Sequence, residues 1–73
     1  MMAMADFALQ GDHITLAQAL KAVGLAGSGG QAKHLVRSGT IVVNGSVETQ
    51  PGRKLYPGDR FRGPDPTEWV ISK

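Results

Sequence analysis

The residues of this sequence that could bind an anion are concentrated in the stretch SGGQAKHLVRSG, which begins at Ser28. Its two adjacent glycines are small, and small residues at the start of a helix leave backbone N–H groups open to a phosphate. Lys33 and Arg37 are four residues apart, so they project from one side of a helix, and His34 lies beside them. The stretch therefore predicts a site for phosphate groups.

Two better-known kinds of phosphate site do not fit this chain. Residues 27–32 match the dinucleotide pattern G-x-G-x-x-A, but that pattern requires a preceding strand in a βαβ unit, and here a helix precedes it. The chain also has no Gly-Lys pair followed by Ser or Thr, which a P-loop requires. We therefore expect no nucleotide site and no other cofactor.

Catalytic and metal-binding groups are scarce. The sequence has no cysteine, and its two histidines, His13 and His34, have no carboxylate cluster near them in the sequence. Ser28 and Ser38 lack a recognisable base and acid. We therefore predict that the protein is not an enzyme, holds no metal and has no small-molecule substrate.

The positive charge lies in the middle of the chain. Although the formal net charge is only +2, residues 33–62 hold six of the eight Lys and Arg residues and two of the six acidic ones. A local excess of this kind is typical of proteins that bind polyanions, although an ordinary solvated surface can also have it.

Two capped helices and several short strands must position these groups. Residues 14–24 have a helical apolar period with a possible capping box at Thr15, and Ser28 can cap a second, basic helix that ends near Gly39. Asn44-Gly45 predicts a β-hairpin, and the stretches DFALQ and EWVIS predict a strand at each end of the chain. The fold class we expect is α+β, with two packed helices against a small, mostly antiparallel sheet.

The apolar phases of these elements predict the core. We expect seven side chains to be largely buried: Leu16, Leu20, Val23, Leu35, Val36, Val43 and Phe61. Phe7 should lie in the core, and Trp69 should pack in the terminal strand. Tyr56 should lie in the core or at its rim, although a position near the basic face is also open.

The length of 73 residues predicts one domain spanning residues 1–73. No apolar run approaches the roughly 20 residues that cross a bilayer, and the start lacks the features of a secretory signal. We therefore expect a cytoplasmic monomer with no membrane partner.

The order of these motifs resembles the RNA-binding domain named after small-subunit ribosomal protein four, here called the S-four domain. The matching stretches are SGGQAKHLVRSG, TIVVNGSVE and LYPGDRF, and the resemblance covers residues 14–61. In that family two helices and the following β-turn region (the alpha-L motif) grip structured RNA. The chain is most similar to small stand-alone bacterial members, which add a strand at each end, and this implies ribosomal or other structured RNA as the partner.

The resemblance also implies which residues form the RNA-binding face. On and before the second helix they are Ser28, Gly29, Gly30, Lys33, His34 and Arg37, and the β region adds Arg53 and Lys54. Many family members have Arg at the position of Gly29, so this chain lacks one phosphate contact of the family pattern. Asn44 and Gly45 match the family turn and are expected to be structural.

Two other functions remain open from the sequence. The two helices and their Gly-containing turn permit a helix-turn-helix DNA-binding protein, although glycines at the base-reading end of the second helix would offer few side chains to bases. The basic patch also permits an adaptor that binds an acidic protein.

Overall fold

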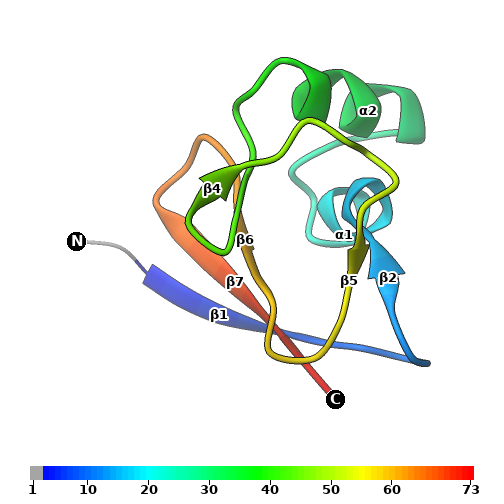
Figure 1. The fold of residues 1–73 in the computed structure, drawn as a ribbon, viewed down its shortest axis with the longest axis vertical. Coiled ribbons are helices and arrows are strands. Elements are labelled where there is room, and N and C mark those ends of the chain that lie inside the picture. The colour runs from blue at the N-terminus through cyan, green and yellow to red at the C-terminus, as the bar shows by residue number, and fades with distance from the viewer. Residues whose placement is uncertain (1–2) are drawn as a thin grey trace.

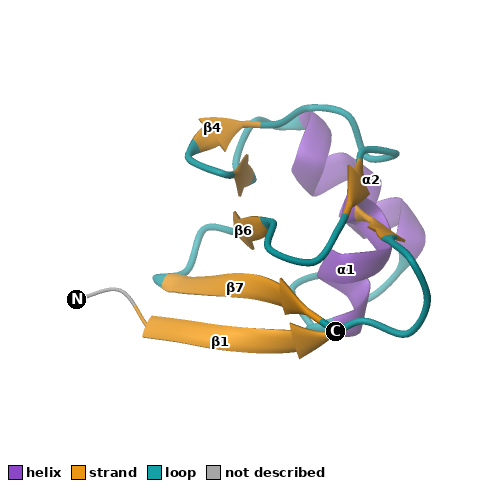
Figure 2. Cartoon of the chain, turned by 60° about the horizontal axis from the view of Figure 1, so that its bottom comes forward, coloured by secondary structure: helices purple, strands orange, loops and turns teal. Residues whose placement is uncertain are grey.

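The computed structural model describes residues 3–73 as two helices packed against a sheet, with the core between them (Figures 1 and 2). This arrangement confirms the predicted α+β class. In chain order the elements are β1 (Ala3–Ala8), β2 (Ile14–Thr15), α1 (Leu16–Ala22), α2 (Gly29–Arg37), β3 (Val42–Val43), β4 (Ser46–Val47), β5 (Lys54–Leu55), β6 (Arg60–Arg62) and β7 (Thr67–Ser72). In residues 3–73 neither helix is long and apolar enough to span a membrane.

The strands form one five-stranded sheet and one two-stranded sheet. The larger sheet has the order β1-β7-β6-β3-β4, and each of its neighbouring pairs is antiparallel except β1 with β7. The smaller sheet pairs β2 with β5 in antiparallel fashion. The predicted mostly antiparallel sheet and the two terminal strands are therefore confirmed, and the terminal strands pair with each other.

Both helices begin at the predicted caps. The Thr15 hydroxyl accepts a hydrogen bond from the Gln18 N–H, and the Gln18 side chain accepts one from the Thr15 N–H, which completes a capping box. At α2 the Ser28 hydroxyl accepts from the Gln31 N–H at 3.1 Å, but the Gln31 side chain accepts from Gly27 at 2.6 Å. The second box is therefore displaced by one residue toward the loop.

The Asn44-Gly45 turn joins β3 to β4 and also holds the start of β6. Asn44 and Gly45 have φ values of 51° and 85°, the left-handed conformation that a two-residue hairpin turn of type I′ requires. The Asn44 side chain donates to Asp59 Oδ1 at 3.2 Å and accepts from the Arg60 N–H at 2.9 Å. Asp59 Oδ2 in turn accepts from the Tyr56 N–H at 2.8 Å. The motifs VNG and PGD therefore contact each other directly.

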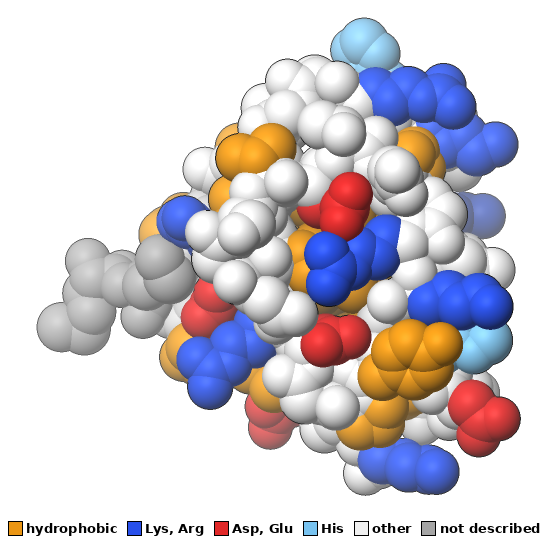
Figure 3. Space-filling model, viewed as in Figure 1, with side chains coloured by type: hydrophobic (Ala, Val, Ile, Leu, Met, Phe, Trp, Pro, Cys, Tyr) orange, Lys and Arg blue, Asp and Glu red, His pale blue; other side chains and the backbone are white. Residues whose placement is uncertain are grey.

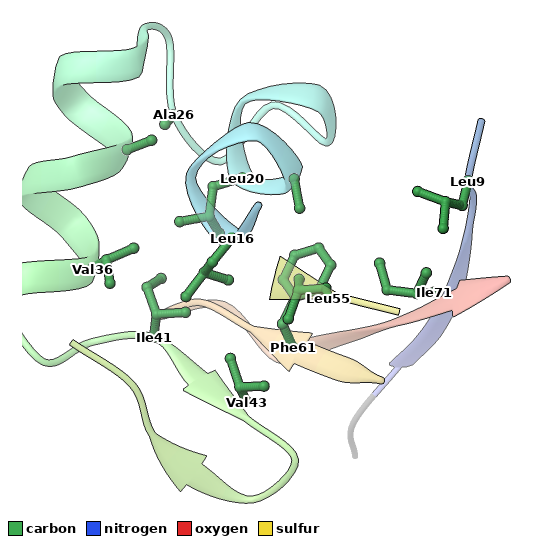
Figure 4. Close-up of a cluster of buried hydrophobic side chains, with 12 residues drawn as sticks. Leu9, Leu16, Leu20, Ala26, Val36, Ile41, Val43, Leu55, Phe61 and Ile71 are labelled. Atoms are coloured by element: carbon green, nitrogen blue, oxygen red, sulfur yellow. The ribbon is translucent and has the colours of Figure 1, made fainter. Parts of the chain in front are cut away.

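The core lies between the helices and the larger sheet, and Figure 4 shows its side chains converging from both. Five of the seven predicted core residues are fully buried: Leu16, Leu20, Val36, Val43 and Phe61. Val23 and Leu35 are only half-buried, so that part of the prediction is wrong. Val23 is the C-cap of α1, already outside the helix, and Leu35 lies at the edge of the apolar face whose centre Ala32 and Val36 occupy.

The aromatic side chains are less buried than expected. Phe7 and Trp69 are half-buried, and Trp69 stacks on the buried Phe61 with ring centroids 6.5 Å apart. Tyr56 is 48% exposed, so it does not lie in the core. The preceding residue, Leu55, is fully buried, and successive residues of an extended chain point to opposite sides.

Leu20→Ala should lower the free energy of unfolding by about 2–5 kcal/mol, because it leaves a cavity at the centre of the core. Val23→Ala, at the half-buried C-cap of α1, should lower the free energy of unfolding by less. Urea denaturation followed by circular dichroism measures both. Equal losses in the two variants would contradict the core described above.

Candidate nucleic-acid interface

Helix α2 presents one apolar side to the core and one basic side to solvent. Ala32 and Val36 are fully buried, whereas Lys33, His34 and Arg37 are exposed. The spacing of four residues places Lys33 and Arg37 on the same side of the helix. The structure therefore brings together the three α2 side chains that the sequence analysis assigned to the RNA-binding face.

Three cations of this region have no acidic partner among the described residues. In residues 3–73, Lys33, Arg37 and Lys54 make no ion pair with a carboxylate. Figure 3 shows Lys and Arg side chains gathered over α2 at the upper right of the molecule and continuing down the edge where β2 and β5 lie. We call Lys33, His34, Arg37 and Lys54 the α2 basic surface. Unpaired cations are available to bind phosphate oxygens.

Lys54 reaches this surface through the smaller sheet. It lies opposite Thr15 in the β2–β5 pair, and the Leu16 N–H donates to the carbonyl oxygen of Arg53 at 2.8 Å. The chain between β4 and β5 passes beside α2 in Figures 1 and 2 before it enters this pair. The segment from β4 to β5 thus extends from beside α2 to the start of α1, where it positions Lys54.

Arg53 is not an unpaired cation, although the sequence analysis grouped it with Lys54. Its guanidinium donates to Glu48 Oε1 at 2.8 Å, and its side chain is 39% exposed. This hydrogen bond holds the pKa of Glu48 below its ordinary value, helped by N–H groups of Gln50 and Thr49 and opposed by partial burial. Glu48 thereby fixes Arg53 and the loop that leads to Lys54.

The start of α2 is open. Gly29 and Gly30 are exposed, and in the described part of the chain their N–H groups have no hydrogen-bond partner. A Cβ atom built on Gly29 would meet nothing within 4 Å, and one on Gly30 only the Ser28 hydroxyl at 3.9 Å. The packing therefore does not require glycine at either position. Gly27 differs, since its Cβ would lie 3.0 Å from the Gln31 side chain.

Two further arginines lie on a different face. Arg60 and Arg62 flank the fully buried Phe61 on β6, so they point to the outer side of the sheet. Arg60 lies 3.9 Å from Glu68 on the neighbouring strand β7. The central excess of positive charge is therefore divided between the helix side and the sheet side, a division that charge counting along the sequence could not find.

Comparison with known proteins agrees with this geometry. The family model described as S4 domain matches residues 7–71. The chain belongs to the S4-domain family. The matched residues include every position assigned to the RNA-binding face, the last two residues of β1 and all of β7 except Ser72. The predicted resemblance to the S-four domain is thus confirmed, and the family points to a role in RNA binding.

A relative from Bacillus subtilis (strain 168) is similar over much of its length. It is named "Probable ribosome maturation protein RlbA" and is 42% identical over 48 residues, which are 66% of this chain and 68% of the relative.

In residues 3–73 of the present S4 protein, no three His, Cys, Asp or Glu side chains come together as a metal site would require.

Glu48→Gln should remove part of the stability of this S4 protein at neutral pH and part of its acid sensitivity. A carboxyl whose pKa is lowered by folding stabilises above its ordinary value of 4.5 and loses that contribution as the pH falls through its folded value. The free energy of unfolding of the parent should therefore exceed that of Glu48→Gln by about 1 kcal/mol or less near pH 7. In strong acid the two free energies should converge. Urea denaturation across the acidic range measures the difference, and a difference independent of pH would contradict the pair.

Proposed function

We propose that this chain binds structured RNA, with ribosomal RNA as the first candidate, through the α2 basic surface. The observation that carries the proposal is the set of exposed cations on α2 and β5, which have no carboxylate partner in residues 3–73 of a chain that belongs to the S4-domain family. The name of the Bacillus subtilis relative, a probable ribosome maturation protein, supports a ribosome-related role.

The geometry suits recognition of an RNA backbone. Lys33 and Arg37 can contact successive phosphates from one side of α2, and the N–H groups of Gly29 and Gly30 can donate to a phosphate at its start. Structured RNA is read largely by shape and by phosphate and 2′-hydroxyl contacts, for which such a surface suffices. We propose that the protein acts as a cytoplasmic monomer, without a cofactor and without catalysing a reaction.

The two other functions are less well supported. A DNA-reading helix would need side chains at its N-terminal end, where α2 has Gly29 and Gly30. An acidic protein partner would be compatible with the charge, and its carboxylates could also accept from the open N–H groups. The family membership favours RNA over such a partner. Parallel titrations with an RNA hairpin, a DNA duplex of the same stem sequence and poly-glutamate separate the three.

Lys33→Gln/Arg37→Gln should weaken RNA binding and flatten its salt dependence, by about one unit of log–log slope per lost phosphate contact. The matched control is Arg60→Gln/Arg62→Gln, which removes the same charge from the sheet side and should change affinity less. Fluorescence anisotropy of a labelled ribosomal RNA hairpin across a series of KCl concentrations measures both. Thermal melts confirm that each variant is folded.

Equal losses in the two double variants would mean that binding follows net charge alone, and unchanged binding by the α2 variant would exclude this surface. Tighter binding to poly-glutamate than to RNA would favour the adaptor function.

Gly29→Arg should strengthen RNA binding, because it restores the cation of the family pattern at a position with room for a side chain. We expect the salt slope to rise by about one unit. Stability should not fall, since arginine is a better helix former than glycine. Gly29→Ala is the control for helix propensity, and an equal gain in affinity from both substitutions would contradict a new phosphate contact.

A further inference from the structure

Tyr56 and His13 form an exposed aromatic pair at one end of the α2 basic surface. Their ring centroids are 5.8 Å apart and the rings are tilted by 45°. His13 directly precedes β2, and Tyr56 directly follows β5, so the pairing of these two strands brings the rings together. Figure 3 shows an exposed hydrophobic side chain against a His side chain at the right of the molecule, with a Lys or Arg side chain directly above them.

The Tyr56 ring lies outside the core. The other aromatic residues contribute to the core, since Phe61 is buried and Phe7 and Trp69 pack against it. Tyr56 is 48% exposed, and its hydroxyl has no hydrogen-bond partner within residues 3–73. An exposed ring of this kind is available to stack on a planar ligand.

A groove lies on the His13 side of this pair. It has a volume of about 550 Å³, and His13 is one of its lining residues. The other lining residues are apolar or carry a side-chain amide: Phe7, Ala8, Leu9, Gln10, Ile14 and Gln18. The amides of Gln10 and Gln18 can each donate and accept hydrogen bonds, as the edge of a nucleobase requires. The Gln18 carbonyl oxygen already accepts from Thr15, so its NH₂ group is the part that remains available.

The pair also lies next to a cation of the proposed RNA-binding face. Lys54 and Tyr56 are both exposed and flank the buried Leu55, so alternation along the chain directs them to the same side. A backbone phosphate bound by Lys54 would hold the adjoining nucleotide within reach of the Tyr56 ring. Stacking on an aromatic ring beside a cation is a recurring way to bind an unpaired base.

We infer that the His13–Tyr56 pair is a stacking site for one unpaired nucleobase of the bound RNA, with the groove beside His13 receiving the edge of that base. The inference rests on the proposed RNA-binding function and adds a preference to it. A surface of cations alone would bind any RNA of suitable shape, whereas this site favours RNA in which a loop or bulge lies next to a helix.

The test compares two RNAs that have the same stem. One is a hairpin whose loop contains the fluorescent base 2-aminopurine, and the other is a blunt duplex without a loop. Tyr56→Leu removes the aromatic ring but keeps an apolar side chain, Tyr56→Phe keeps the ring, and Val47→Ala alters another exposed apolar residue, 62% exposed on β4. Because these residues are exposed, thermal melts should change little.

The parent and Tyr56→Phe should quench 2-aminopurine fluorescence on binding, and Tyr56→Leu should not. Tyr56→Leu should weaken hairpin binding by about 5- to 100-fold and duplex binding by less than about two-fold, the range that loss of one stacked base produces. Its salt slope should equal that of the parent, because no phosphate contact is lost. Val47→Ala should resemble the parent with both RNAs.

Unchanged hairpin binding by folded Tyr56→Leu, or equal weakening with hairpin and duplex, would overturn the stacking site. The variant Lys33→Gln/Arg37→Gln tests the underlying function separately, because it should weaken binding to both RNAs. If that variant binds both RNAs as the parent does, the proposed RNA-binding surface fails, whatever Tyr56→Leu does.

Discussion

The hydrogen bonds of the Asn44 side chain are the interaction on which the arrangement of the strands depends. Asn44 occupies a left-handed turn and hydrogen-bonds to Asp59 and to the backbone of Arg60, so the hairpin tip is joined to the start of β6. Asp59 in turn accepts a hydrogen bond from the N–H of Tyr56, the residue that follows β5. Strand β5 pairs with β2. Because α1 begins at the end of β2, and α1 packs on α2, one amide links the hairpin to both helices. Asparagine suits this position since it tolerates positive φ and has a donor and an acceptor on one short side chain.

The distribution of paired and unpaired charge separates the two sides of the molecule. Arg53 and Arg60 are engaged by Glu48 and Glu68, so these arginines serve mainly to hold a loop and a strand pair. Lys33 and Arg37 have no such partner in the described chain. They are exposed because the opposite, apolar side of α2 packs on the core. Net charge therefore understates the capacity of the helix side to bind a polyanion, because the cations with acidic partners lie in the β region.

The features that the sequence predicted correctly are encoded by neighbouring residues. The caps at Thr15 and Ser28, the Asn44-Gly45 turn and the basic side of α2 each depend on residues within four positions of one another. The parallel pairing of β1 with β7 could not be predicted in this way, because it depends on how the whole chain folds back. The Glu48–Arg53 pair was missed for a related reason, since it spans five residues of irregular backbone where no periodicity indicates which side chains meet. The exposure of Tyr56 depends on the burial of Leu55 beside it. That burial results from the pairing of β5 with β2, which no pattern of neighbouring residues indicates.

The pairing of β1 with β7 also bears on the order in which the chain can fold. The Ser72 hydroxyl donates to the carbonyl oxygen of Phe7, a contact between residues 65 positions apart, whereas α1 and α2 follow one another closely in the sequence. Contacts between distant residues form slowly because a long loop must close first. During synthesis β1 can pair with β7 only after residues 67–72 have been made, whereas the residues of both helices are made earlier. Among the strand pairs of this fold, the pairing of β1 with β7 therefore requires the longest loop to close.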